Sequence, residues 1–203
     1  MGKQEQPIAV AITGASGSAY ALRLLECLLS AGEAVYLMIS QAGQIVLKME
    51  SDLELPAQPG EVERLLSTRF DAAPGQLRVF GRQQWMAPVA SGSNPPRAMV
   101  VCPCTTGTLS AIACGASNDL LERAADVVLK ERRKLILVVR ETPLSEIHLE
   151  NMLKLSRMGA TIMPANPGFY HRPENLQQLV DFMVARILDQ LELPHQLMAR
   201  WGE

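Results

Sequence analysis

The sequence predicts an α/β protein in which a doubly wound parallel sheet is covered by helices on both faces. Short apolar runs of strand length alternate with segments of helical periodicity along the whole chain. These runs are apolar throughout rather than at every second residue, which is typical of parallel strands buried on both faces. With 203 residues and a hydrophobic share of 48%, the chain suits one domain with a substantial core.

Six segments are predicted as strands. The first, residues 8–13 (IAVAIT), is rich in β-branched residues and is followed by Gly14. The other predicted strands are residues 34–39, 77–80, 98–102, 135–139 and 160–163, and residues 51–60 and 83–96 are predicted loops. Each strand is short and is bounded by Gly, Pro or polar residues, as expected where turns join strands to helices.

Helices are predicted between these strands from apolar residues spaced three and four apart. The predicted helices are residues 18–31, 41–49 (with Ser40 as N-cap), 61–70, 109–114, 119–132, 145–158 and 174–191. In the last helix the apolar stripe is Leu176, Val180, Met183, Ile187 and Leu191. This alternation defines a flavodoxin- or Rossmann-like three-layer sandwich. We expect residues 1–203 to form a single domain with a C-terminal arm at about 194–203, in which Trp201 packs on a partner subunit.

Composition and charge argue against several classes of function. The 19 basic and 21 acidic residues give a net charge of −2, whereas a general nucleic-acid binder needs a basic excess. The longest uncharged stretch, residues 98–118, is too polar and too often broken by Pro and Gly to cross a membrane. The N-terminus lacks signal-peptide features, and the four cysteines form no spaced framework. We therefore expect a cytoplasmic protein without a metal site.

Ligands of such a sheet bind beyond the carboxyl ends of the strands, so the loop at residues 14–19 (GASGSA) is the first candidate site. Free N–H groups where this loop opens a helix favour a phosphate. However, the loop is not G-x-G-x-x-G, and the second strand ends in Ser40 rather than in the acid that binds an NAD ribose. No GxxxxGK[ST] motif is present either. FMN therefore fits better than NAD or ATP, and a tight turn for helix packing is the alternative interpretation.

Polar residues also follow two later strands. Residues 105–108 (TTGT) offer hydroxyl and backbone donors for flavin or phosphate oxygens, and helix N-capping explains them nearly as well. Arg140 and Glu141 follow a fully apolar strand. There they could bind an anion and move a proton, or they could form a solvated ion pair.

Two helices and one loop carry further candidates. Arg123 and Lys130 lie seven residues apart on one helical stripe, where they could bind a phosphate or pair with Asp126. Arg186 lies at the margin of the last apolar stripe and could reach a ligand or extend to solvent. Tyr170 follows the last strand and could donate its hydroxyl to an anion or anchor its loop.

Three blocks of this sequence together resemble the flavin prenyltransferases of the UbiX type. They are TGASGSAYALRLL, CPCTTGTLSAIACGASNDLLERAADVVLKERRKLILVVRETPLS and NPGFYHRPENLQQLVDFMVARILD, and the resemblance spans nearly the whole chain. The wider flavodoxin-like group includes flavin-dependent cysteine decarboxylases. Their PxMNxxMW-type motif is missing here, which favours the prenyltransferases.

The resemblance implies transfer of a dimethylallyl group from dimethylallyl monophosphate to N5 and C6 of reduced FMN, without a metal. The product, prenylated FMN, would serve a UbiD-type decarboxylase, usually in ubiquinone biosynthesis. The resemblance further implies a homododecamer. An FMN-dependent decarboxylase and a non-catalytic flavin carrier are the alternative functions.

The resemblance also implies roles for individual residues. The positions matching FMN-binding residues are Gly14, Ala15, Ser16, Ser40, Thr105, Thr106, Gly107, Thr108 and Arg140. Those matching residues that hold the allylic phosphate are Arg123, Lys130, Arg140, Tyr170 and Arg186. The catalytic assignments are Glu141 as acid–base residue, Ser16 as proton relay, Trp85 as aromatic wall, Lys130 at the phosphate, and Glu50 as a carboxylate from a neighbouring subunit.

Overall fold

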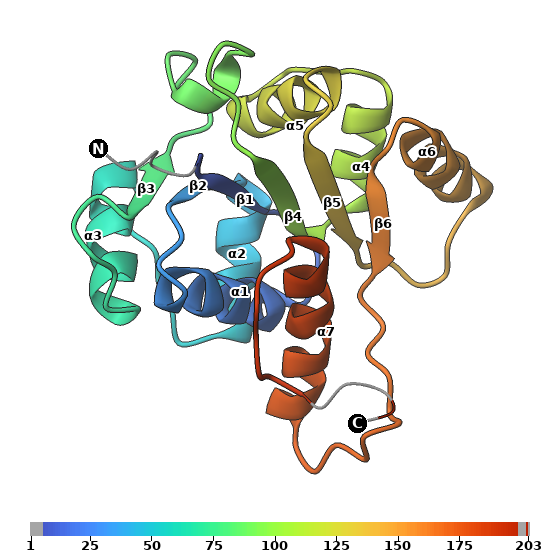
Figure 1. Cartoon of the computed structure of the whole chain (residues 1–203). Coiled ribbons are helices and arrows are strands. Elements are labelled where there is room, and N and C mark those ends of the chain that lie inside the picture. The colour runs from blue at the N-terminus through green and yellow to red at the C-terminus, as the bar shows by residue number, and fades with distance from the viewer. Residues whose placement is uncertain (1–5, 199–201, 203) are drawn as a thin grey trace.

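The computed structural model describes residues 6–198 and residue 202, and it contains one six-stranded parallel sheet (Figure 1). The strands are β1 (Ile8–Ile12), β2 (Val35–Ile39), β3 (Leu77–Phe80), β4 (Ala98–Cys104), β5 (Lys134–Val139) and β6 (Thr161–Pro164). Their order is β3-β2-β1-β4-β5-β6, and every neighbouring pair is parallel. This is a doubly wound order whose direction reverses between β1 and β4, which confirms the predicted fold class.

Helices cover both faces of the sheet. They are α1 (Ser18–Ser30), α2 (Gln41–Glu50), α3 (Pro59–Arg69), α4 (Thr106–Ala113), α5 (Leu120–Lys130), α6 (Glu146–Arg157) and α7 (Leu176–Gln190), with a 3₁₀ turn η1 (Pro88–Ala90). One core lies under α1, α2, α3 and α7, and the other lies under α4, α5 and α6. Figure 1 shows α1 beside α7 on one face and α4 with α5 on the other. The strands supply both cores because successive side chains point to opposite faces.

Aliphatic packing holds α1, and with it the loop after β1, against the sheet. Leu24, Leu25 and Leu28 of α1 are fully buried. Burial of each such side chain contributes about 1.5–3 kcal/mol relative to exposure. The start of α1 is therefore held firmly at the carboxyl edge of the sheet, where ligands of this fold bind.

Two of the expectations for individual elements are wrong. The edge strand β6 is only half-buried, because an edge strand lacks a neighbour on one side. Leu176 is exposed in the first turn of α7 rather than part of its buried stripe. Residues 83–96 form a loop as predicted, and this loop includes the short η1 turn.

Two boundaries near the predicted site also differ from expectation. β4 continues through Pro103 and Cys104, and the Pro103 carbonyl accepts a hydrogen bond from the Thr13 N–H at 3.2 Å. α4 begins at Thr106 rather than at residue 109, because the Thr105 side chain caps the helix by accepting from the Thr108 N–H at 3.1 Å. The TTGT segment is thus a cap and a first helical turn.

The beginning of the predicted C-terminal arm packs on the chain itself. Leu193 and Leu197 pack against the core under α1 and α7. Trp201 lies outside the described residues, so its predicted contact with a partner subunit stays a prediction. In the part of the chain that the structure describes, no helix combines the length and apolar character needed to cross a bilayer.

Candidate functional site

Thr13 joins the loops that follow β1 and β4, the two strands at the reversal of the sheet. Its buried hydroxyl donates to the Pro103 carbonyl at 2.7 Å and accepts from the Thr105 N–H at 2.9 Å. The two loops predicted to bind FMN are therefore fixed side by side. Sequence analysis missed this residue. Its only signal was a hydroxyl side chain at the end of an apolar strand.

Two glycines give the first loop its shape. A Cβ at Gly14 would overlap the Cβ of Ala42 in α2. Gly17, the N-cap of α1, has φ +112°, in a region that side chains rarely adopt. Close packing and a tight turn thus account for both glycines. Between them, Ala15 is buried and Ser16 is exposed at the edge of the sheet.

Glu50, at the end of α2, caps the start of α1 in the same chain. Its Oε2 accepts from the backbone N–H groups of Gly17 at 2.9 Å and Ser18 at 2.8 Å. Burial alone would raise the pKa of Glu50, but hydrogen bonds from the Ser16 side chain and these N–H groups outweigh it and lower the pKa. Ser16, predicted as a proton relay, and Glu50, predicted as a carboxylate from a neighbouring subunit, are therefore in contact within one chain.

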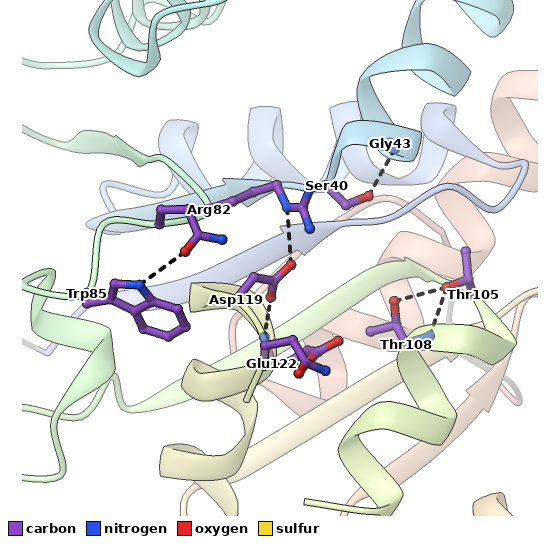
Figure 2. Close-up of polar contacts among 10 residues, drawn as sticks. Ser40, Gly43, Arg82, Trp85, Thr105, Thr108, Asp119 and Glu122 are labelled. Atoms are coloured by element: carbon purple, nitrogen blue, oxygen red, sulfur yellow. Dashed lines mark hydrogen bonds and ion pairs between the residues drawn. The ribbon is translucent and has the colours of Figure 1, made fainter. Parts of the chain in front are cut away.

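Side-chain caps begin the helices after β2 and β4. Ser40 accepts from the Gly43 N–H at 3.0 Å, and Thr105 donates its hydroxyl to Thr108 at 2.9 Å (Figure 2). The capping interpretation of the TTGT segment is therefore confirmed for Thr105. Thr106, in the same first turn, donates towards Glu141 Oε2 at 3.5 Å.

Arg140 offers a buried hydrogen-bond donor that could bind an anion. Its Nε has no hydrogen-bond partner in the part of the chain that the structure describes, while its backbone N–H donates to the Cys104 carbonyl at 3.2 Å. Among the described residues, no ion pair joins Arg140 to Glu141, so the solvated pair considered above does not form. A buried donor without an acceptor costs about 1–3 kcal/mol. An oxygen of a bound flavin or phosphate would remove that cost, so the residues fit FMN.

Lys130 does not lie with Arg140 in one chain. It ends α5 and contacts Glu131 rather than Asp126. β5 begins at Lys134 and ends at Val139, one residue before Arg140. Those six residues span roughly 20 Å at about 3.3 Å per residue. Lys130 therefore lies near the amino ends of the strands, whereas Arg140 lies at their carboxyl ends.

The other predicted phosphate ligands are engaged elsewhere. Arg123 donates to the Ala90 carbonyl at 3.0 Å and pairs with Asp126 at 2.7 Å, as the alternative interpretation expected. Arg186 pairs with Asp189 at 2.6 Å. The last turn of α7 contacts Lys134, at the start of β5. Arg186, one turn earlier in α7, therefore also lies towards the amino ends of the strands.

Two aromatic candidates are displayed on loops. Trp85 follows β3, is 43% exposed, and donates its indole N–H to Gln83 at 3.1 Å. Tyr170 is 79% exposed in the loop between β6 and α7. One chain thus assembles the predicted FMN residues with Glu141, but it does not assemble the predicted phosphate residues around them.

A cavity of about 440 Å³ lies beyond the carboxyl ends of β2 and β3. Ile39, Val62 and Phe80 give it apolar walls, and Arg82 and Gln83 add polar groups. This volume is within the usual range of small-molecule pockets.

The cysteines next to the site are not reactive groups. Burial raises the pKa of the Cys104 thiol to about 12 and raises that of Cys102 further, so both stay protonated at neutral pH. They also face opposite cores. The described residues contain no group of three or more His, Cys, Asp and Glu side chains that could hold a metal ion.

The sequence is similar to proteins that bind flavins. The family model described as Flavoprotein matches residues 2–188. The sequence is also 59% identical over 196 residues to the flavin prenyltransferase UbiX of Pseudomonas aeruginosa, covering 97% of this chain and 94% of that protein. The chain therefore belongs to the flavin prenyltransferase family of the UbiX type, as the resemblance indicated.

Solved structures agree with this placement. AnUbiX (PadA1), in complex with FMN and dimethylallyl pyrophosphate, is 40% identical with a TM-score of 0.86, over 98% of both chains. A dodecameric FMN-dependent UbiX-like decarboxylase from Escherichia coli O157:H7 is 37% identical with a TM-score of 0.86, over 97% of this chain and 100% of that one.

Proposed function

We propose that this protein transfers a dimethylallyl group from dimethylallyl monophosphate to N5 and C6 of reduced FMN. Membership of the family supports the reaction class, and the solved relative AnUbiX binds FMN together with a dimethylallyl ester. The observation that carries the assignment is the buried Nε of Arg140, which has no hydrogen-bond partner among the described residues and lies next to Glu141 after β5, the strand beside β4. We assign FMN to the carboxyl ends of four neighbouring strands, β2, β1, β4 and β5, where Gly14, Ala15, Ser16, Ser40, Thr105–Thr108 and Arg140 lie.

The charges at this edge suit cleavage of an allylic C–O bond. The bond breaks towards the phosphate oxygen, so a nearby cation such as Arg140 stabilises the developing negative charge. Glu141 is positioned to give the departing phosphate a proton and to accept one later, and Thr106 orients its carboxyl group. Bound reduced FMN supplies the two nucleophilic atoms. The hydroxyl of Ser16 is hydrogen-bonded to the Glu50 carboxylate and offers a second path for a proton.

We further propose that neighbouring subunits complete the site. Lys130 and Arg186 lie towards the opposite ends of the strands from Arg140 within one chain, and Arg123 is engaged by Ala90 and Asp126, whereas an allylic phosphate beside a flavin needs cations around it. Assembly would bring them from other copies and would exclude the water that traps an allylic cation. A homododecamer is proposed because the Escherichia coli relative is dodecameric. Tyr170 joins the same phosphate group in this proposal.

The biological setting is part of the proposal. Prenylated FMN would be released to a UbiD-type decarboxylase in the cytoplasm, in ubiquinone biosynthesis, and no metal ion would take part. The support for these points is the family resemblance.

Anaerobic turnover tests the proposed function. Purified, EDTA-treated protein is mixed with reduced FMN and dimethylallyl monophosphate, and the mass and spectrum of the flavin are followed. We expect the flavin to gain one dimethylallyl unit only when both substrates are present. An unmodified flavin after long incubation contradicts the proposal, and release of carbon dioxide from an aromatic acid by the protein alone would favour the decarboxylase.

A further inference from the structure

We propose that Asp119 is a positioning residue for Trp85 and acts through Arg82. The proposal deepens the proposed function and rests on it, because Trp85 is taken there as an aromatic wall of the site. It is carried by the hydrogen bonds of the segment from Gly81 to Ala90, which holds Trp85 between β3 and α5.

Hydrogen bonds within this segment are local. Gln84 donates to the Gly81 carbonyl at 3.1 Å, Ala87 donates to the Gln84 carbonyl at 2.9 Å, and the Trp85 indole donates to Gln83 at 3.1 Å. Each joins residues no more than three positions apart. They give the segment a shape, but they do not determine where it lies relative to the sheet.

The first residue of α5 and its N-cap together hold Arg82. The Leu120 N–H donates to the Arg82 carbonyl at 2.8 Å, and Arg82 Nε donates to Asp119 Oδ2 at 3.3 Å (Figure 2). The Asp119 side chain is 10% exposed and that of Arg82 is 48% exposed, so the carboxylate is shielded from water while the guanidinium stays partly in solvent. Arg82 therefore has both its backbone and its side chain attached to the start of α5.

A second attachment lies at the other end of the segment. Arg123, one turn further along α5, donates to the Ala90 carbonyl at 3.0 Å. Trp85 lies between the two attachments, and Gln83, which holds the indole N–H, directly follows Arg82. Ala87 and Val89, which follow Trp85, are also buried in the core under α5. The position of the Trp85 ring is thus coupled to α5 through Arg82 and Asp119 on one side, and through Arg123 and this packing on the other.

The two oxygens of Asp119 have separable tasks. Oδ1 caps α5 by accepting from the Glu122 N–H at 3.0 Å, while Oδ2 binds Arg82. Asn is as good an N-cap as Asp. Asp119→Asn can therefore keep the cap and remove the charge that holds Arg82, and Arg82→Gln removes the same pair without touching Asp119.

Loosening Trp85 would change where the dimethylallyl group goes. An aromatic face stabilises a nearby cation. When that face is displaced, water competes better for the dimethylallyl carbon. Cleavage of the C–O bond followed by attack of water yields dimethylallyl alcohol, phosphate and a proton instead of prenylated FMN. A purely structural loss would lower both products together.

The experiment uses Trp201→Phe as background, because the chain has two tryptophans and Trp85 is then the sole tryptophan, which can be excited selectively over tyrosine. Asp119→Asn and Arg82→Gln are compared with a control, Asp52→Asn. This change breaks the 3.2 Å ion pair between Asp52 and Arg69, the last residue of α3. Acrylamide quenching of Trp85 is measured in the full-length protein saturated with FMN. The ratio of dimethylallyl alcohol to prenylated FMN is measured in the same samples.

We expect both test variants to raise the quenching of Trp85, with the alcohol-to-product ratio rising about tenfold, as for loss of one hydrogen bond to a charged group. Asp52→Asn should leave both readouts unchanged. Wild-type quenching in folded Arg82→Gln overturns the proposal, even if Asp119→Asn fails to fold. If quenching rises in a protein whose parent makes no prenylated FMN, the proposed function fails while the positioning of Trp85 by Asp119 stands.

Discussion

The carboxylate of Glu50 accepts a hydrogen bond from the backbone N–H of Ser18 at 2.8 Å, across 32 residues of sequence. Gly17, the N-cap of α1, has no side chain to cap the helix, so Glu50 supplies the missing acceptor from α2. A negative charge at a helix N-terminus is stabilised by the helix dipole. The first loop of the predicted FMN site is thus held by an acid from the next helix.

The pH dependence of stability should reflect this contact. The pKa of Glu50 is lowered from its ordinary value of 4.5, so its contribution is fully present above that pH and is lost as pH falls through the lower, folded value. The urea unfolding midpoint of the wild type should therefore fall between neutral and acidic pH. In Glu50→Gln the part of this fall that Glu50 causes should be missing. Glu174→Gln, an exposed acid before α7, is the control and should keep the wild-type profile. An unchanged profile in Glu50→Gln would contradict the capping role.

Glu141→Gln should bind FMN with nearly wild-type affinity yet lose about 10²- to 10⁴-fold in kcat, because the shape stays and the proton carrier goes. Single-turnover flavin spectra give the rate, and fluorescence titration gives the affinity. Arg157→Gln, at the exposed end of α6, serves as the matched control. Wild-type turnover in Glu141→Gln would remove this residue from the mechanism.

Gly14→Ala should destabilise the fold and weaken FMN binding, because the new methyl group would overlap Ala42 of α2. Overpacking of this kind costs about 1–3 kcal/mol. Gly60→Ala meets only open space near the start of α3 and should leave stability equal or slightly higher. Urea unfolding compares the two variants, and equal midpoints would show that α2 moves away at little cost.

Mixed oligomers test whether the site is shared between subunits. Lys130→Ala and Glu141→Gln, each weakly active alone, should recover part of the activity when refolded or coexpressed together, because some sites then receive both native residues. Arg140→Gln with Glu141→Gln is the control. Those two residues are adjacent in one chain, so the mixture should recover nothing. Failure of the first mixture, with mixing verified by mass, contradicts the shared site.

Much of the site could be predicted because it follows from local sequence. Ser40 and Thr105 are caps that side-chain chemistry predicts, and Gly17 adopts a conformation that favours glycine. The hydrogen-bond and ion-pair partners of individual side chains were less predictable. Lys130 contacts Glu131 instead of Asp126, and Thr13 bonds to residues that lie 90 and 92 positions further along the chain. Helical spacing allows several ion pairs and cannot choose among them.

By itself, the sequence determined the alternation of strands and helices, the parallel buried sheet and the family. These are encoded in local apolar periodicity and in contiguous motifs. Only the tertiary structure decided which polar groups meet at the sheet edge. It attached the Trp85 segment to Asp119, placed Glu50 at the start of α1, and left Arg140 Nε buried with no partner in the described part of the chain. Such contacts depend on how elements distant in sequence pack, because hydrogen bonds require atoms within about 3 Å of each other.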